Sequence, residues 1–390
     1  MKKYLLEIGL GAILLCVVGV YGVFFISHPA KWSDFRAFYS GVQLWHEQPA
    51  SLYDLEVQKE YQLRMVKPDE KSGTVLLPLI NPPSFLLFYS WAIGMDQQLA
   101  YWIFGGVMAS LYLVILLGLR QLFPVKHSGW LLLVSLSFAP IYATLFLGQS
   151  SVISLGVFTL IYLCLRDKRW WWAGLMTGLL AYKPQLMIGL GLYYLVTVRD
   201  WRLWAGLFVG GLGHVLVSWW MVPDFAPQLL GTIWFAFGQH GMGPELRVTW
   251  MGLVYQFLRW TGWSWWPMVG LGLSAATLAV MTWVVRDYRI GKKGWEVAFG
   301  LTIVSTLLGG IHAHYHDVLL MVLVAWLMIW RYGWNRWTMT GLITGWLVYM
   351  GASFTPMYPN PLPVLPTAFL AGVWICIVGS LLAKNGDMEN

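Results

Sequence analysis

Residues 99–119 read LAYWIFGGVMASLYLVILLGL, an apolar run that carries no charged side chain. Its length matches the roughly 20 residues that a helix needs to cross the hydrocarbon of a bilayer. Comparable apolar runs occupy residues 5–26 and 364–382. Transmembrane β-barrels instead show strands of about ten residues in which apolar and polar side chains alternate. The runs therefore predict an all-α chain that crosses the membrane several times.

The composition of the chain also fits a membrane protein. Of its 390 residues, 58% are hydrophobic and 11% are charged, against roughly 25% charged in a soluble domain. The net charge is +7, but Lys and Arg are scattered through short loops, so nucleic acid is not an expected partner. Cys16, Cys164 and Cys376 lie inside apolar runs, which gives no support for a disulfide framework or a zinc site.

Basic residues predict the topology, because Lys and Arg concentrate at cytoplasmic ends of membrane helices. All the flanking basic groups can be placed on one side, which makes both termini cytoplasmic and leaves residues 5–27 as an uncleaved first helix. The predicted crossings are 5–27, 98–120, 129–147, 150–166, 170–183, 184–198, 201–221, 265–286, 295–311, 317–331, 337–353 and 364–382.

The chain is expected to form one integral membrane domain over residues 1–390, a helical bundle with about 12–13 transmembrane helices. Residues 76–94 and 250–260 do not fit as crossings and are expected to form re-entrant or interfacial helices. The outer face then collects a first loop, residues 28–83, and a second segment, residues 222–264. Most of the unusual polar residues lie there.

Asp34 follows the first helix on the predicted outer side. A carboxylate at the membrane surface can act as general base on an acceptor hydroxyl if it is held within hydrogen-bond reach. The alternative is structural, because Ser33 or Asp34 could cap a short amphipathic helix that runs through Phe35, Phe38 and Val42.

Lys183 stands between two apolar stretches and is followed by Pro184. An ionisable side chain at membrane depth is a functional candidate, here for contact with an anionic phosphate. In the alternative, the lysine extends along the lipid and places its ammonium among the headgroups.

Four polar side chains cluster in the segment GGIHAHYHD, at His312, His314, His316 and Asp317. On a helix His312 and His316 would share one face, as in a two-histidine metal site. The segment has no obvious third ligand, so no metal is expected. Contact between one or two of these histidines and a phosphate is the favoured interpretation, and simple exposure to water is the alternative.

Other polar residues are weaker candidates. Gly148-Gln149-Ser150-Ser151 joins two apolar helices and is either a phosphate or sugar contact at a helix start or a plain turn. Asn81-Pro82-Pro83-Ser84 is either a rigid break or a wall of the site. In the second outer segment, solvated loop positions are expected for Asp224, His240, Glu245 and Arg247.

The ordered set of these motifs resembles glycosyltransferase family 87, a group of polytopic GT-C-type enzymes. The match rests on SDFRAFY (33–39) followed by LYD (52–54), NPP (81–83), GQS (148–150) leading to WAGL (172–175) and YKP (182–184), and HYHD (314–317). These motifs extend over most of the chain.

The resemblance implies an inverting hexosyltransferase of the bacterial plasma membrane, with a GT-C-like bundle and no cofactor. Its donor would be a polyprenyl-phosphate-linked sugar, mannose by family analogy, and its acceptor a hydroxyl of a glycolipid or glycan. Asp34 matches the catalytic aspartate. Lys183, His312, His314 and His316 are candidate contacts for the donor phosphate. The motifs also supply candidate substrate contacts at Arg36, Tyr39, Asn81 and Gln149.

Two other functions share the membrane setting. A transporter or flippase of lipid-linked sugars would be expected to show charges at the membrane midplane and paired inverted repeats, and the sequence shows neither. A ligase that moves whole glycans between lipid carriers would differ only in its product.

Overall fold

The computed structural model describes residues 2–27, 33–65, 76–238, 247–258, 261–262, 264–353 and 364–386. Over these ranges the chain consists of helices and connecting segments, with one isolated β-bridge and no strand. The all-α prediction is confirmed.

Each predicted crossing coincides with a helix or with a pair of consecutive helices. The α-helices are α1 (Lys2–Ser27), α2 (Phe35–Glu47), α3 (Leu55–Leu63), α4 (Gln97–Leu122), α5 (Ser128–Leu136), α6 (Ala139–Leu147), α7 (Ser151–Arg166), α8 (Trp170–Gly178), α9 (Gln185–Thr197), α10 (Trp201–Met221), α11 (Phe225–Gly238), α12 (Trp250–Leu258), α13 (Trp266–Val285), α14 (Trp295–Gly309), α15 (Met321–Tyr332), α16 (Arg336–Ser353) and α17 (Val364–Gly386). Short 3₁₀ helices add η2 (Pro49–Ser51), η4 (Pro83–Ala92), η5 (Leu179–Tyr182) and η8 (Tyr315–Leu320).

Within the described ranges, six helical segments are long and apolar enough to cross a membrane. They are Gln97–Leu122, Ser128–Leu147, Trp201–Met221, Trp266–Val285, Tyr315–Tyr332 and Val364–Ala383. The chain is therefore a multi-pass membrane protein. The total of about 12–13 crossings and the cytoplasmic placement of the termini stay predictions.

The two blocks that did not fit as crossings contain the short helices η4 and α12, and their re-entrant or interfacial placement stays a prediction. Pro83 occupies the first turn of η4, where a missing N–H costs no helical hydrogen bond. The second outer segment also contains α11, a fourteen-residue apolar helix that the sequence pattern did not predict.

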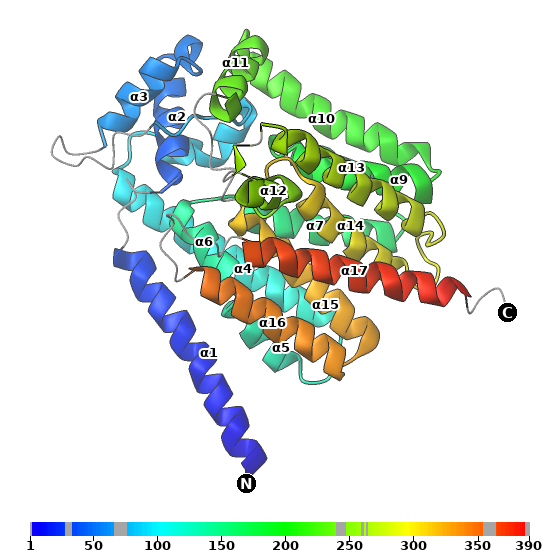
Figure 1. Cartoon of the computed structure of the whole chain (residues 1–390). Coiled ribbons are helices and arrows are strands. Elements are labelled where there is room, and N and C mark those ends of the chain that lie inside the picture. Colours follow the sequence, from blue (N-terminus) through cyan, green and yellow to red (C-terminus); the bar gives the residue numbers. More distant parts are fainter. Residues whose placement is uncertain are drawn as a thin grey trace.

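Figure 1 shows the helices gathered in one bundle, from which α1 projects at the lower left while α2, α3 and α11 lie together at the upper left. The middle of the bundle is α14, whose residues are all buried except the half-buried Glu296 and which packs against α9, α13, α15 and α17. A helix that is apolar on every side belongs at such a position.

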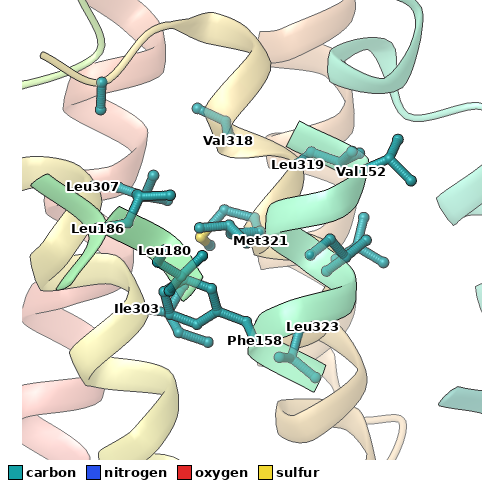
Figure 2. Packing of buried hydrophobic residues seen from close by; sticks show 14 of the residues in the cluster. Val152, Phe158, Leu180, Leu186, Ile303, Leu307, Val318, Leu319, Met321 and Leu323 are labelled. Carbon is teal, nitrogen blue, oxygen red and sulfur yellow. The ribbon is translucent and has the colours of Figure 1, made fainter. Parts of the chain in front are cut away.

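The core beside α14 is filled by aliphatic and aromatic side chains. Figure 2 shows Phe158 of α7, Leu180 of η5, Ile303 of α14 and Leu323 of α15 converging on one another, and all four are fully buried. Leu186 of α9 lies beside them in the same view, so helices that lie far apart in the sequence, such as α7 and α14, pack into one core.

Helices α8 and α10 approach each other through glycines. Gly174 and Gly178 on α8 face Gly206 and Gly210 on α10, and a Cβ built on Gly206 would lie 2.1 Å from the carbonyl oxygen of Trp171. Membrane helices use such small residues, four positions apart, to bring their backbones into contact. This contact fixes α8 and, through it, the η5 turn that follows.

We predict that Gly206→Ala destabilises the protein, because the added methyl group overpacks the α8–α10 contact at a cost of about 1–3 kcal/mol. Gly213→Ala on the same helix is the matched control, since its Cβ would meet no atom within 4 Å. Thermal unfolding of the purified variants in detergent measures the difference. Equal melting temperatures for Gly206→Ala and Gly213→Ala would contradict the predicted contact.

Candidate active site

Asp34 stands at the N-cap position of α2, but its side chain makes no capping hydrogen bond. Its Oδ2 instead accepts a hydrogen bond of 2.8 Å from Nε2 of Gln149. The capping alternative is therefore wrong for Asp34. Helix α2 is held by its apolar face, with Phe35, Phe38 and Val42 buried, and so the backbone beside Asp34 is anchored without help from its carboxylate.

Gln149 is brought to Asp34 by the turn between α6 and α7. Gly148 ends α6 in the left-handed conformation, with φ of +66°, which glycine adopts without steric cost. A Cβ at Gly148 would lie 2.5 Å from the Cβ of Phe35, and Tyr89 donates a hydrogen bond to the Gly148 carbonyl. The turn is thus pressed against the start of α2.

Lys183 forms a buried ion pair with Asp317. Its Nζ lies 2.7 Å from Oδ1 of Asp317, and the two side chains are 8% and 2% exposed. Ser151 donates to the same oxygen at 3.1 Å, while Oδ2 accepts the backbone N–H of His314 at 3.1 Å. The alternative in which Lys183 extends to the headgroups is wrong, because the ammonium faces a carboxylate inside the protein.

The turn that carries Lys183 is held from both sides. Asn81 donates a side-chain hydrogen bond of 3.2 Å to the Tyr182 carbonyl, and Tyr53 donates to the Asn81 carbonyl at 2.7 Å. The Tyr182 hydroxyl shares a hydrogen bond of 2.9 Å with Ser154. Asn81 therefore positions the backbone next to Lys183. The sequence predicted a substrate contact at Asn81 and did not predict this structural role.

The three histidines do not share a helix. His312 lies in a bend, His314 pairs with Arg247 in an isolated antiparallel bridge, and η8 begins only at Tyr315. The helical two-histidine metal arrangement is therefore wrong. Nε2 of His312 and Nε2 of His314 lie 3.0 Å apart, so one ring donates and the other accepts. No cluster of three or more potential metal ligands occurs among the described residues.

His316 and Arg247 complete the surroundings of this segment. His316 is buried, and its Nε2 lies 3.5 Å from Oδ2 of Asp317. Arg247 is 4% exposed, so its expected placement as a solvated loop residue is wrong. Its bridge to His314 places the start of the α12 segment against the histidine turn.

Burial sets the protonation of two site residues outside the membrane-spanning helices. It raises the pKa of the Asp34 carboxyl above its usual value, although the Gln149 hydrogen bond and the positive charges of Arg36 and Lys183 act in the opposite direction. Burial also holds the pKa of His312 well below its usual range, and repulsion from His314 adds to the effect. His312 is thus a neutral hydrogen-bonding group at neutral pH.

The residues that the sequence predicted for the site do not all lie together in the structure. Asp34 and Lys183 belong to two hydrogen-bonded groups that the turn between α6 and α7 connects: Gln149 donates to Asp34, and Ser151, two residues further along the chain, donates to Asp317. The hydroxyl of Tyr39 instead donates to the Met95 carbonyl, whereas Arg36 is buried and acts on Asp34 through its charge. Asp224 is exposed, and His240 and Glu245 lie outside the described residues.

Two features were missed from the sequence. Asp317 was grouped with the histidines without a role, although a buried lysine requires a counter-ion and Asp317 was an available carboxylate. His214 of α10 also escaped notice: its Nδ1 lies 2.8 Å from Ser84 Oγ and its Nε2 3.1 Å from the Leu179 carbonyl oxygen. Its position inside an otherwise apolar helix was the sequence feature that could have identified it as a buried polar contact. It links α10 to η4 and η5.

We predict that Lys183→Met and Asp317→Asn each destabilise the protein strongly, because removing one partner of a buried ion pair costs about 3–5 kcal/mol. The double variant should recover most of that loss, since no unpaired charge remains. A double-mutant cycle on the free energy of unfolding measures this coupling. Additive losses in the double variant would show that the two groups do not stabilise each other.

Comparison with known proteins gives the family. Residues 79–313, more than half of the chain, match glycosyltransferase family 87. The matched region contains Asn81, Gln149 and Lys183, whereas Asp34 and Asp317 lie outside it. No curated protein and no solved structure matches the chain. The chain is a multi-pass membrane protein that belongs to glycosyltransferase family 87.

Proposed function

We propose that this glycosyltransferase moves a sugar, with mannose the first candidate, from a polyprenyl-phosphate donor to a hydroxyl acceptor on the non-cytoplasmic face of the membrane. The donor would be a lipid, and the acceptor a glycolipid or glycan. The observation that carries the proposal is a buried carboxylate, Asp34, that Gln149 holds in place and that lies close enough to the buried Lys183 for the charge of the lysine to lower the pKa of the carboxyl. Family membership supports the reaction class.

In the proposed reaction Asp34 removes the proton from the acceptor hydroxyl. The acceptor oxygen attacks the anomeric carbon and forms the new glycosidic bond. The bond from that carbon to the phosphate oxygen breaks at the same time, and its electron pair leaves with the polyprenyl phosphate. One displacement of this kind inverts the anomeric configuration.

Lys183 supplies the positive charge that the departing phosphate needs. Asp317 and Ser151 hold the ammonium in place before the donor binds, so little reorganisation is needed when negative charge develops on the phosphate. The adjoining turn, which carries the bonded pair His312 and His314, would provide a further contact for the phosphate. Catalysis then consists of orientation, proton removal and stabilisation of the leaving group.

Asp34→Asn is expected to lower the turnover number by about 100-fold or more, because a positioned general base contributes at least that factor. The assay uses purified protein in nanodiscs, radiolabelled polyprenyl-phosphate mannose and an acceptor pool from membrane extract. Product analysis also separates transfer of one sugar from transfer of a whole glycan.

Asp54→Asn is the matched control, because Asp54 belongs to the same outer loop but caps α3 through the N–H groups of Glu56 and Val57. Its turnover should stay near that of the wild type. Normal transfer by Asp34→Asn would refute the proposed base. If mannose is never transferred but another polyprenyl-phosphate sugar is consumed, the proposed sugar is wrong and the reaction class stands.

The pH dependence of kcat/KM tests the role of Asp34 independently. The carboxylate is active when ionised, so activity should rise with pH through its pKa, with a midpoint above the ordinary value of about 3.9 because burial raises that pKa. Gln149→Leu removes a hydrogen bond that lowers the pKa, and it should therefore shift the midpoint to higher pH. An unchanged midpoint would contradict this assignment.

Gln43→Leu serves as the control for that measurement. Gln43 lies on α2 like the residues beside Asp34, but its amide donates to the Ala92 carbonyl. Its loss should leave the midpoint of the pH profile unchanged.

A further inference from the structure

His214 is a polar side chain inside α10, one of the helices long and apolar enough to cross the membrane. Both of its ring nitrogens reach another segment: Nδ1 lies 2.8 Å from Oγ of Ser84 in η4, and Nε2 lies 3.1 Å from the carbonyl oxygen of Leu179 in η5. Ionisable side chains are costly at membrane depth and usually serve a function there. The proposed reaction gives the imidazole no task, so its place in the helix needs another reason.

The hydrogen bonds of His214 fix the tautomer of its ring. A backbone carbonyl can only accept, so Nε2 carries the proton and donates to Leu179. Nδ1 of the neutral ring then accepts the hydroxyl of Ser84. Ser218, one turn after His214 on α10, donates its hydroxyl to Oγ of Ser84 at 3.0 Å and accepts the N–H of Ser84 at 3.1 Å. One directed chain of hydrogen bonds therefore runs from the η4 backbone across α10 to the η5 backbone.

This chain of hydrogen bonds holds the turn that carries Lys183. Leu179 is the first residue of η5, and Lys183 directly follows its last residue. His214 therefore holds the beginning of η5, while Asn81, just before η4, holds its end by donating to the Tyr182 carbonyl at 3.2 Å. Because η5 has four residues, a shift at Leu179 is passed on to Lys183.

The ammonium of Lys183 depends on this alignment. Its Nζ lies 2.7 Å from Oδ1 of Asp317, and both side chains are almost fully buried. Misplacing a catalytic group by about 1 Å can lower a rate about a hundredfold. The position of the η5 backbone is therefore part of what sets the rate of the proposed reaction.

We infer that His214 is a positioning residue for the sugar transfer, because its bond to Leu179 holds η5 where Lys183 faces Asp317. The inference rests on the proposed function and deepens it, since it names the group that aligns the phosphate-binding lysine. Of the two bonds of the ring, the one to Leu179 acts on the lysine through η5, and the one to Ser84 anchors the imidazole to η4.

Two substitutions separate the two hydrogen bonds of the ring. In His214→Gln the amide nitrogen reaches the place of Nε2 and still donates to Leu179. In His214→Asn the amide oxygen reaches the place of Nδ1 and still accepts from Ser84, but the bond to Leu179 is lost. Thr282→Val on α13 is the control, because the Thr282 hydroxyl donates to the Leu278 carbonyl of its own helix.

Sugar transfer from radiolabelled polyprenyl-phosphate mannose is measured in nanodiscs. We expect His214→Asn to lower kcat at least about tenfold and to leave KM within about threefold, because additional negative charge reaches the phosphate only as its bond breaks. His214→Gln should keep most of the wild-type kcat, and Thr282→Val should match the wild type. Equal losses of kcat in His214→Asn and His214→Gln would overturn the inference, and so would a wild-type kcat in His214→Asn.

A second readout needs no sugar transfer. It compares the loss of melting temperature that His214→Asn causes in the wild type and in the double variant Lys183→Met/Asp317→Asn. The loss should fall to about half or less in the double variant, because no ion pair remains to be misaligned. Equal losses in the two backgrounds would show a merely structural histidine and overturn the inference.

The two readouts separate the inference from the function on which it rests. Coupling of His214 to the ion pair, without transfer from any polyprenyl-phosphate sugar, would refute the proposed reaction and leave the positioning of Lys183 in place. Mannose transfer that is lost in Lys183→Met/Asp317→Asn but unchanged in His214→Asn would refute the positioning role and leave the proposed reaction in place.

Discussion

The candidate site depends on the ion pair between Lys183 and Asp317. Either charge alone would be costly at this depth, since desolvation of an unpaired ion outweighs any packing that it gains. The pair is satisfied only when the end of η5, the start of α7 and the start of η8 come together, because Ser151 and the N–H of His314 complete its hydrogen bonds. One electrostatic requirement therefore fixes three segments that lie far apart in the sequence.

Close backbone contacts make this meeting possible. The glycines of α8 and α10 let two helices touch, and this places η5 and the lysine that follows it. Gly148 does the same for the α6–α7 turn, because only a residue without Cβ fits against Phe35 at that position. Gln149 then reaches Asp34, and Ser151 reaches Asp317. Glycines that lie outside the candidate site thus determine where its polar side chains are placed.

The bundle keeps a polar and an apolar region apart. Charged and imidazole groups gather where η5, α7 and η8 meet, while a cavity that follows α15 from Met321 to Tyr332 is lined mainly by apolar side chains. The aromatic rings of Tyr315, Tyr349 and Phe369 lie between the two.

The sequence by itself determined the all-α membrane class, the positions of the predicted crossings and the family, because hydrophobic length and ordered local motifs are properties of neighbouring residues; α11 was not predicted. It also marked Asp34, Lys183 and the histidines as unusual for their surroundings. Only the tertiary structure decided their partners: that Asp34 accepts from Gln149, that Lys183 pairs with Asp317, and that His312 and His316 share no helix. The Asp34–Gln149 and Lys183–Asp317 pairs join residues more than 100 positions apart, and their energies depend on burial and distance. Hydrophobic periodicity encodes neither quantity.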